Sequence, residues 1–376
     1  MRLGVRLFSG APLFLLYKFI LFTYNQYFHI LLKMFQNISS SQIKEHKKIK
    51  DNFLNADFKK LNFSCNIYSG NFYLDTFNYF LINEDFITFN ELFTRDVSLN
   101  IDHFFTDKFF NNFNKNINNF KEFKNLFVLG SNTANNFYSN LIQFLPRIFF
   151  IKKNNIKIAI HRNLSNNFRE FIKVILHSMK INFSFVYLDD GFYKFIDSEF
   201  PQFFDLEQSN KILKKFLTPS NFNSNDKKLY ITRQDANYRK VINESDIVPI
   251  LKSKGFKIIN PLFYKVDEQI KIFANADKII APHGSNLSNI IFCKPKTEIY
   301  EIAPNFQSVS EKIFEDRYKK LADINDLKYT RLITDSVPVE THGQKTQQYI
   351  DKNFLNKSNY YKHLIVKVGE LEKFIN

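Results

Sequence analysis

Residues 229–302 read LYITRQDANYRKVINESDIVPILKSKGFKIINPLFYKVDEQIKIFANADKIIAPHGSNLSNIIFCKPKTEIYEI, and four short apolar runs recur in this stretch. The runs are Leu229–Ile231, Phe256–Ile259, Lys278–Ala281 and Glu298–Ile302, and segments with a helix-like pattern separate them. Strands that alternate with helices predict a parallel sheet. We therefore expect an α/β fold in this half of the chain.

Polar side chains follow these predicted strands. Arg233 follows the first strand, His283 follows the third, and Glu301 lies near the end of the fourth. Ligands of open α/β sheets bind outside the carboxyl ends of the strands. The guanidinium groups of Arg233 and Arg239 suit bidentate contacts with phosphate. The carboxylate of Glu301 suits the two hydroxyls of a ribose, so the edge is predicted to bind a nucleotide.

The turn after the third strand adds backbone donors to this edge. Gly284, Ser285 and Asn286 precede a predicted helix over residues 287–292, and N–H groups at a helix start attract anions. Gly284 lets the backbone approach a ligand, and Ser285 or Asn286 is expected to cap the helix. His283 titrates near neutral pH and can donate to a phosphate or leaving group. Each residue alone also fits a plainer role, such as a surface charge or a turn; their shared edge favours one site.

Several motifs in this stretch resemble the pattern of glycosyltransferase family 61. They are Thr232, Arg233, Asp235, Ala236, Arg239, Asn243, Glu244, Glu268, Gln269, His283, Gly284, Ser285, Leu287, Asn289 and Glu301. The resemblance implies a GT-B architecture, in which two Rossmann-like domains face a cleft. It also implies a nucleotide-sugar donor, inversion at the anomeric carbon, and no required metal or other cofactor.

Under this resemblance the residues of the edge take roles in sugar transfer. Arg233, Arg239 and the turn 284–286 bind the donor diphosphate, and Glu301 binds the ribose. His283 is a catalytic candidate through the phosphate or leaving group. Asp235 is a candidate base only because it lies beside the arginine turn.

The amino-terminal half carries a weaker part of the same resemblance. Residues 136–147 read NFYSNLIQFLPR, and they place Asn136 and Arg147 on the acceptor side of the expected cleft. Ser139 and Asn140 stand where the family pattern has His and Trp. The resemblance therefore names no catalytic base in this segment. A different acceptor and an inactive member of the family remain as alternatives.

The length of 376 residues suits two domains with separate cores. We expect an amphipathic segment over 1–50, an acceptor-side α/β domain over 51–216, and a nucleotide-sugar-binding domain over 229–355. A linker rich in Asn, Ser, Pro and Lys joins the domains. In the first domain, edge strands are expected within 52–103, strands at 126–130, 156–160 and 183–188, and helices at 136–150 and 166–179. The last segment, 356–376, offers a strand and a helix, and the resemblance implies that this segment crosses back to the first domain.

The formal net charge of +15 raises the question of an anionic partner. Nucleic acid is not expected, because the lysines are spread and no nucleic-acid-binding motif is present. The dense basic run KEHKKIK at residues 44–50 follows an apolar, amphipathic stretch over residues 7–35. This order predicts a helix on the inner surface of a membrane, with a helix on the protein's own surface as the alternative. Two cysteines, Cys65 and Cys293, provide no disulfide framework, which suits a reducing cytoplasm.

The adjacent carboxylates Asp189 and Asp190 do not have the Asp-x-Asp spacing of a metal-dependent transferase, so no metal site is expected. The predicted function is inverting transfer of a sugar from a nucleotide-sugar, expected to be a UDP-sugar. The acceptor is a glycan or lipid-linked glycan in surface polysaccharide synthesis, such as capsule or lipopolysaccharide. The alternatives are a non-catalytic nucleotide- or glycan-binding relative, and a nucleotide-sugar hydrolase or epimerase.

Overall fold

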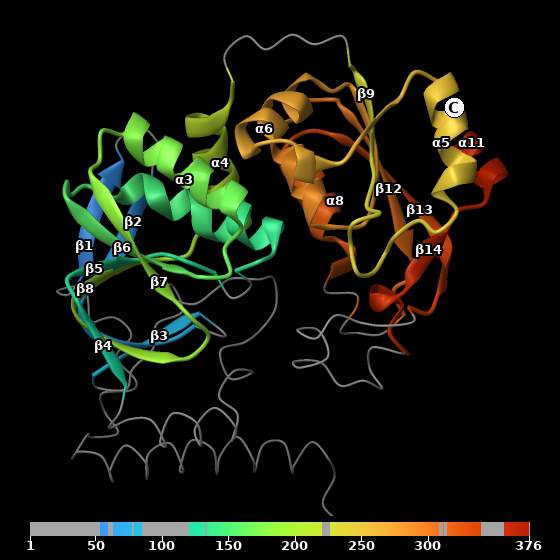
Figure 1. Ribbon diagram of the computed structural model, residues 1–376. Helices are drawn as coiled ribbons and strands as arrows, with labels where there is room; N and C mark the ends of the chain where they lie inside the picture. Colours follow the sequence, from blue (N-terminus) through green and yellow to red (C-terminus); the bar gives the residue numbers. More distant parts are fainter. Residues whose placement is uncertain are drawn as a thin grey trace, which may run out of the picture.

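The structure is a computed structural model that describes residues 53–58, 63–76, 79–84, 120–131, 134–219, 226–307, 311, 314–339 and 357–375. The predicted membrane-surface segment, 1–50, lies outside these residues. The described chain forms a mixed α/β fold with two sheets (Figure 1). In the described part, no helix is long and apolar enough to span a bilayer.

The second sheet contains the strands that the sequence predicts. Its order is β10-β9-β11-β12-β13-β14, and all neighbours are parallel except the antiparallel pair β13 and β14. The bounds are β9 Lys228–Ile231, β10 Lys257–Ile259, β11 Lys278–Pro282, β12 Glu298–Pro304, β13 Lys328–Val337 and β14 His363–Ile365. The side chains of residues 229–231 are all buried, as expected for a parallel strand covered on both faces. The four predicted strands are confirmed.

The order of these strands locates a crevice. Numbered along the chain from β9, the parallel strands run 2-1-3-4-5, which is the flavodoxin-like order and not the 3-2-1-4-5-6 order of a Rossmann domain. β10, the next strand along the chain, lies on one side of β9, and β11, the strand after that, lies on the other side of β9. Ligands of such sheets bind at this switch point, outside the carboxyl ends of the first and third strands. Here those strands are β9 and β11.

The first sheet has the order β1-β2-β8-β5-β6-β7, and in addition β3 pairs with β2 and β4 with β8. Its strands are β1 Phe53–Phe58, β2 Phe63–Asp75, β3 Phe80–Asn83, β4 Lys121–Lys124, β5 Leu126–Val128, β6 Ile156–His161, β7 Phe183–Leu188 and β8 Phe192–Pro201. The strands predicted at 126–130, 156–160 and 183–188 are confirmed. β7 and β8 both run parallel to β5 and lie on opposite sides of it in the sheet, yet only residues 189–191 connect them. So short a connection requires the sheet to be strongly curled (Figure 1). A second apolar core, including Phe72, Val128 and Phe195, fills the curl.

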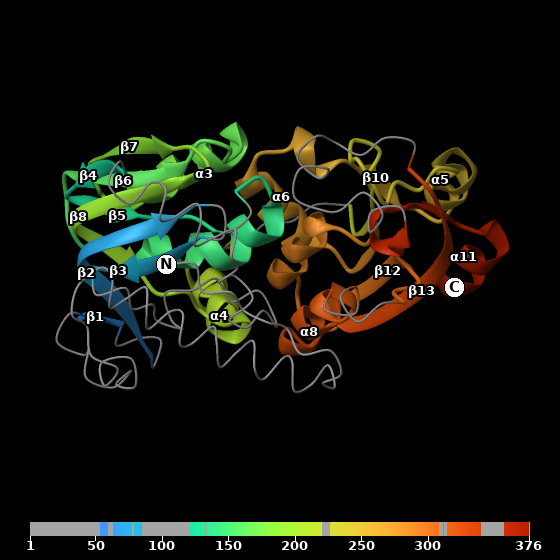
Figure 2. The same cartoon turned by 90° about the horizontal axis from the view of Figure 1, so that it is seen from below.

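The helices between the two sheets are α3 Asn166–Ser178, α4 Leu206–Leu217, α6 Val266–Asn275 and α8 Arg317–Ile324. The other face of the second sheet is covered by α5 Glu244–Ser253 and α11 Val368–Ile375 (Figure 1). α3 contacts α6, and α4 contacts α8 (Figure 2). One cluster of buried apolar side chains joins Leu141 and Phe168 of the first half to Ile270 and Leu287 of the second. The two halves therefore share a core.

The helix predicted over 136–150 is helical but is not an α-helix. It consists of a π-helix, η4 (Ser139–Phe144), followed by a 3-10 helix, η5 (Leu145–Phe150). Pro146 has no backbone N–H and cannot continue an α-helical ladder. The N–H of Leu145 instead donates to the carbonyl of Asn140, five residues back. The proline therefore accounts for the change of helix type.

The expectation that the last segment crosses back to the first domain is wrong for the described residues. β14 adds to the second sheet beside β13, and Leu364 packs with Val241, Ile247 and Leu371 of the same half. Asn243 fixes the strand by two hydrogen bonds to the backbone of Val366, at 2.8 and 3.0 Å. The buried side chains of α11 pack in the same apolar cluster as those of α5, so α11 stays with the second sheet.

Candidate functional site

Arg233 and Gly284 meet at the switch point of the second sheet. Arg233 follows β9, and Gly284 follows β11, the neighbouring strand. A Cβ atom at position 284 would lie 2.8 Å from Cζ of Arg233 and closer still to Nη1. The φ angle of Gly284 is 176°, an extended conformation open to any residue. The glycine is therefore required because it makes room for the guanidinium group and not because of its backbone conformation.

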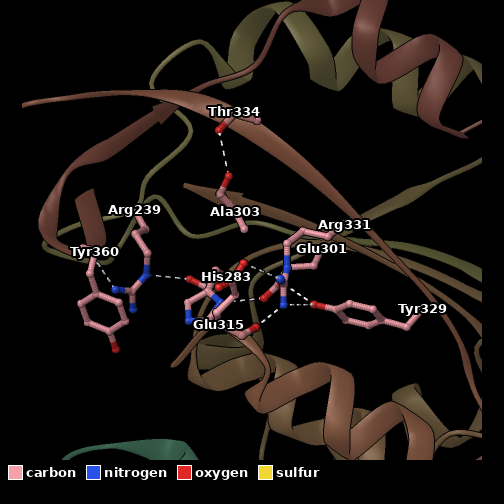
Figure 3. Close-up of polar contacts among 9 residues, drawn as sticks. All are labelled: Arg239, His283, Glu301, Ala303, Glu315, Tyr329, Arg331, Thr334 and Tyr360. Atoms are coloured by element: carbon pink, nitrogen blue, oxygen red, sulfur yellow. Dashed lines mark hydrogen bonds and ion pairs between the residues drawn. The ribbon is translucent and has the colours of Figure 1, made fainter. Parts of the chain in front are cut away.

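Arg239 joins three segments around this point. Its Nε donates to the carbonyl of His283 at 2.8 Å, and its Nη1 donates to the carbonyl of Tyr360 at 2.7 Å (Figure 3). Its guanidinium group lies 3.9 Å above the ring of Tyr360 and 4.7 Å from that of Tyr238. Arg239 is 3% exposed. Arg239 therefore links the segments of the site, and protein atoms cover most of its surface.

His283 and Glu301 form a buried pair. The Nδ1 atom of His283 lies 2.6 Å from Oε1 of Glu301. The other oxygen of Glu301 accepts from the hydroxyl of Tyr329 and, at 2.8 Å, from Nε of Arg331 (Figure 3). Glu301 is fully buried and both oxygens are occupied, so in this arrangement it presents no acceptor to a ribose. Its neighbours come from β13, a strand that the sequence analysis did not predict.

Burial and charge set the protonation of this pair. Burial lowers the pKa of His283 to about 4, and although Glu301 acts in the opposite direction, Arg239 and Arg317 lower it further. Burial opposes a charge on Glu301, but His283, Arg331 and Tyr329 bring its pKa below the usual value. Arg331 supplies the positive partner of the carboxylate. His283 is therefore a neutral imidazole that donates Nδ1–H to an ionised Glu301.

The site carries a positive charge that its own side chains do not cancel. Within the described residues, neither Arg233 nor Arg239 forms an ion pair with a carboxylate. Burial, with a further contribution from the charge of Arg239, lowers the pKa of Arg233 to about 10, so Arg233 remains cationic at neutral pH. Arg233 is nonetheless partly exposed. Two adjacent guanidinium groups without a carboxylate partner favour an anionic ligand.

The turn 284–286 differs in detail from its prediction. The helix that follows is a 3-10 helix, η7, and it begins at Ser285. Its cap position is Gly284, and no side chain caps it, so the expected capping by Ser285 or Asn286 is wrong. The carbonyl of Ser285 accepts from the hydroxyl of Ser288 at 2.6 Å. Gly284, at the start of this turn, lies against Arg233.

Asp235 lies on the loop after β9 and is exposed. Its carboxylate accepts a hydrogen bond from the amide of Asn260 at 3.3 Å, and Asn260 follows β10. The structure thus brings Arg233, Asp235, Arg239, His283 and Gly284 to one edge of the second sheet.

Phe263, on the short 3-10 helix Pro261–Phe263 after Asn260, is the most exposed large apolar residue described, at 84%.

Arg147, predicted on the acceptor side, is instead buried inside the first half. Its Nε and Nη2 donate to the carbonyl of Pro201 at 3.1 and 2.7 Å, and Nη1 donates to that of Gly130 at 2.7 Å. Its guanidinium group lies 4.0 Å from the ring of Phe203, and burial lowers its pKa to about 10. Arg147 thus ties the end of β5 to the end of β8. An exposed acceptor could not reach it.

Asn136, the other predicted acceptor-side residue, has a local role. Its side-chain oxygen accepts from the N–H of Ser139 at 3.2 Å, and its carbonyl accepts from the N–H of Asn140 at 3.0 Å. Asn136 is partly exposed. The structure does not bring it together with Arg147, which is fully buried.

The carboxyl edge of the first sheet carries an ordered pair of carboxylates. Asp190 accepts from Nε2 of His161 at 2.7 Å, and Asp189 accepts from Arg162 at 2.7 Å. The N–H of Asn163 donates to Nδ1 of His161 at 3.0 Å, which fixes the imidazole tautomer. Among the described residues, no group of three His, Cys, Asp or Glu side chains could hold a metal ion.

A hollow of about 450 Å³ opens elsewhere, at the amino ends of β5 and β6. Its lining includes Lys124, Asn125, Lys153, Asn155 and Glu199. Lys153 and Glu199 pair across it at 2.5 Å. The hollow holds none of the residues gathered at the switch point, so size alone does not identify the functional site.

The motif residues of the second half support one another. The hydroxyl of Thr232 lies 2.8 Å from the carboxylate of Glu244, and the amide of Asn289 donates to Gln269 at 3.1 Å. Residues 27–300 match the profile of the family described as Glycosyltransferase 61. The chain belongs to glycosyltransferase family 61. No curated protein matches it in a sequence comparison. As a family 61 glycosyltransferase, the protein uses a sugar donor and a glycan acceptor.

Sequence reasoning missed five residues of this glycosyltransferase's site. Tyr360 lies beyond the family match and reaches the site from residues 357–361. Tyr329 and Arg331 required recognition of β13, where Arg331 is the register partner of Glu301. Arg317 and Tyr318 open α8, and the ring of Tyr318 lies 5.0 Å from that of His283. Of these five residues, only Arg331 could have been predicted from the sequence, because its charge is opposite to that of Glu301 on the adjacent strand.

Proposed function

We propose that this protein transfers a sugar, with inversion, from a UDP-sugar or related nucleotide-sugar to a glycan or lipid-linked glycan. We place the reaction in a GT-B-type cleft between the two halves and its product in a surface polysaccharide. The observation that carries the proposal is the pair of guanidinium groups, Arg233 and Arg239, at the switch point of a nucleotide-binding type of sheet. No carboxylate in the described part of the chain pairs with either group.

In this proposal the donor diphosphate binds to the exposed side of the Arg233 guanidinium group and to the backbone of residues 284–286. Arg239 keeps Tyr360 and the carbonyl of His283 in place and adds positive charge. As the bond between the anomeric carbon and the phosphate oxygen breaks, the diphosphate leaves with the electron pair. Fixed positive groups stabilise that developing charge, so a metal ion is not required. The bond from the acceptor oxygen to the anomeric carbon forms on the opposite face.

His283 has a positioning role in this proposal. Its Nδ1 is committed to Glu301, and rings of Phe306 and Tyr318 lie 5.1 and 5.0 Å from its own. It is 1% exposed and neutral. We therefore assign it to fixing the turn that binds phosphate, and Glu301 to fixing His283.

The acceptor hydroxyl must give its proton to a general base. Two carboxylates are candidates. Asp235 is exposed beside Arg233, and Asp190 is oriented by His161 on the carboxyl edge of the first sheet. Transfer assays with D235N and D190N separate them: the base variant loses turnover while its affinity for the nucleotide stays at the wild-type level.

A nucleotide titration tests the proposed function. The unfolding temperature is measured with UDP, GDP, CMP and ADP for the wild type, R233A and K257A. Lys257 opens β10 at the other edge of the same sheet, so K257A removes one charge away from the site. We expect one nucleoside diphosphate to stabilise the wild type and K257A by mass action, and R233A to lose the effect. A folded wild type that responds to no nucleotide would contradict the proposal.

We also propose that residues 1–50 attach the enzyme to the cytoplasmic face of a membrane, near a lipid-linked acceptor. The amphipathic order of residues 7–35 and the basic run 44–50 support this. Sedimentation with anionic and neutral vesicles tests it. Binding to anionic vesicles that 0.5 M salt fails to weaken, or no binding at all, contradicts the electrostatic part of the proposal.

A further inference from the structure

The segment Ser358–Tyr361 lies over the carboxyl edge of the second sheet. The hydroxyl of Ser358 donates to Glu311, and the N–H of Tyr360 donates to the same oxygen at 3.2 Å. The amide of Asn359 donates to the carbonyl of Asn305, just after β12, at 2.9 Å. The carbonyl of Tyr360 accepts from Arg239 (Figure 3). Tyr360 is thus fixed on both sides of its backbone.

The ring of Tyr360 is fixed as firmly as its backbone. The guanidinium group of Arg239 stacks on it at 3.9 Å, and the ring of Phe314 lies 4.7 Å away. The rings of Tyr361 and His283 lie at 4.9 and 5.9 Å. Tyr360 nevertheless keeps part of its surface exposed. A residue so enclosed and still accessible lines the site.

The charges around Tyr360 come from the two arginines of the proposed phosphate site, Arg233 and Arg239, and from Arg317. Burial acts to raise the pKa of its phenol, yet Arg239, Arg317 and Arg233 together bring it below the ordinary value. The neighbouring Tyr361 shows the opposite direction, because burial and the charges of Tyr360 and Tyr238 raise its pKa. The two adjacent phenols therefore occupy different electrostatic environments.

We propose that Tyr360 is a further ligand of the donor diphosphate, its hydroxyl donating a hydrogen bond to a phosphate oxygen held by Arg233. The proposal rests on the proposed function and adds a residue outside the family match. Its phenol lies among cations that attract the phosphate, and a phenol donates strongly to an anionic oxygen. The C-terminal segment thereby becomes part of the donor site and contributes to holding the departing diphosphate.

The test compares Y360F with the matched control Y361F. Both variants keep the aromatic ring, so the stacking on Arg239 and the unfolding temperature are expected to stay close to those of the wild type. Calorimetric titration with UDP, inorganic pyrophosphate and uridine measures affinity. We expect Y360F to bind UDP and pyrophosphate about tenfold or more weakly, with uridine unaffected. Y361F is expected to bind all three like the wild type.

The outcomes separate the two proposals. A wild type that binds UDP and a Y360F variant that binds it equally well overturn the assignment of Tyr360 and leave the proposed function standing. Equal weakening in Y360F and Y361F also overturns it, because it indicates a general disturbance of the segment. A wild type that binds neither UDP nor another nucleoside diphosphate removes the proposed function, and the role of Tyr360 with it.

Discussion

His283 donates Nδ1–H to Glu301 across 2.6 Å, and both side chains are buried. The pair links the end of β11 to β12, and Arg331 and Tyr329 extend it to β13. This relationship explains why a histidine and a glutamate at the expected ligand edge are inaccessible to ligand. They support the turn that we propose binds phosphate.

The variant E301Q is expected to lower the free energy of unfolding by about 3 kcal/mol, because Arg331 loses its buried countercharge. Urea denaturation monitored by circular dichroism measures the change. The preference for UDP over 2′-deoxy-UDP, measured on the folded variant, is expected to stay the same. A lost preference for the ribose hydroxyl would instead give Glu301 the ribose-binding role that the sequence suggests.

Stability is expected to fall on acidification between pH 6.5 and pH 4. Burial holds the pKa of His283 at about 4, below its value of 6.5 in the unfolded chain. In that range the unfolded state binds more protons than the folded state, so stability rises with pH and is complete above 6.5. The contribution is about 3 kcal/mol over the window. Urea denaturation at pH 7, pH 5 and pH 4 follows it, and H283N should lose this part of the slope.

Four strands of the second sheet, β9 to β12, were predictable because their signal is local. Residues 229–231 and 279–281 are apolar runs bounded by polar segments, and burial on both faces requires such runs. The partners of Glu301 were not predictable in this way. They depend on the register between β12 and β13, and residues 305–327, which separate these strands, carry no strand signal.

Arg147 shows that the sequence also could not predict the role of every candidate site residue. Its Leu-Pro-Arg setting resembles an acceptor-binding motif, and a charged residue is seldom expected in a core. The curled path of β8 brings the carbonyl of Pro201 to its guanidinium group, a contact across 54 positions of sequence. Chain geometry, and not residue type, decides the role of Arg147.

The variant R147K is expected to destabilise the protein by about 3 kcal/mol, because lysine cannot satisfy the carbonyls of Gly130 and Pro201 together. The matched control is R162K, at an exposed arginine on the first sheet, with an expected change below about 1 kcal/mol. Chemical denaturation measures both. UDP affinity of folded R147K is expected to equal that of the wild type, and a selective loss of acceptor binding would contradict the core role.

The variant G284A is expected to weaken UDP binding by about tenfold or more, because the new methyl group displaces the guanidinium group of Arg233. The loss of stability should be only about 1 kcal/mol, since a flexible side chain can move away. G369A is the control, because a Cβ atom there meets no heavy atom within 4 Å. Titration calorimetry and thermal unfolding provide the two readouts. Wild-type affinity in G284A would remove Arg233 from the donor site.

The place of β14 beside β13 has a consequence for synthesis. Arg239 and Asn243 find backbone partners at Tyr360 and Val366, more than 100 residues further along the chain. A nascent chain on the ribosome has already made Arg233 and His283 long before those partners exist. The first sheet and the apolar core inside its curl are synthesised early, whereas the proposed donor site waits for residue 366 to emerge. A truncation before residue 357 should therefore leave β13 as an open, aggregation-prone edge.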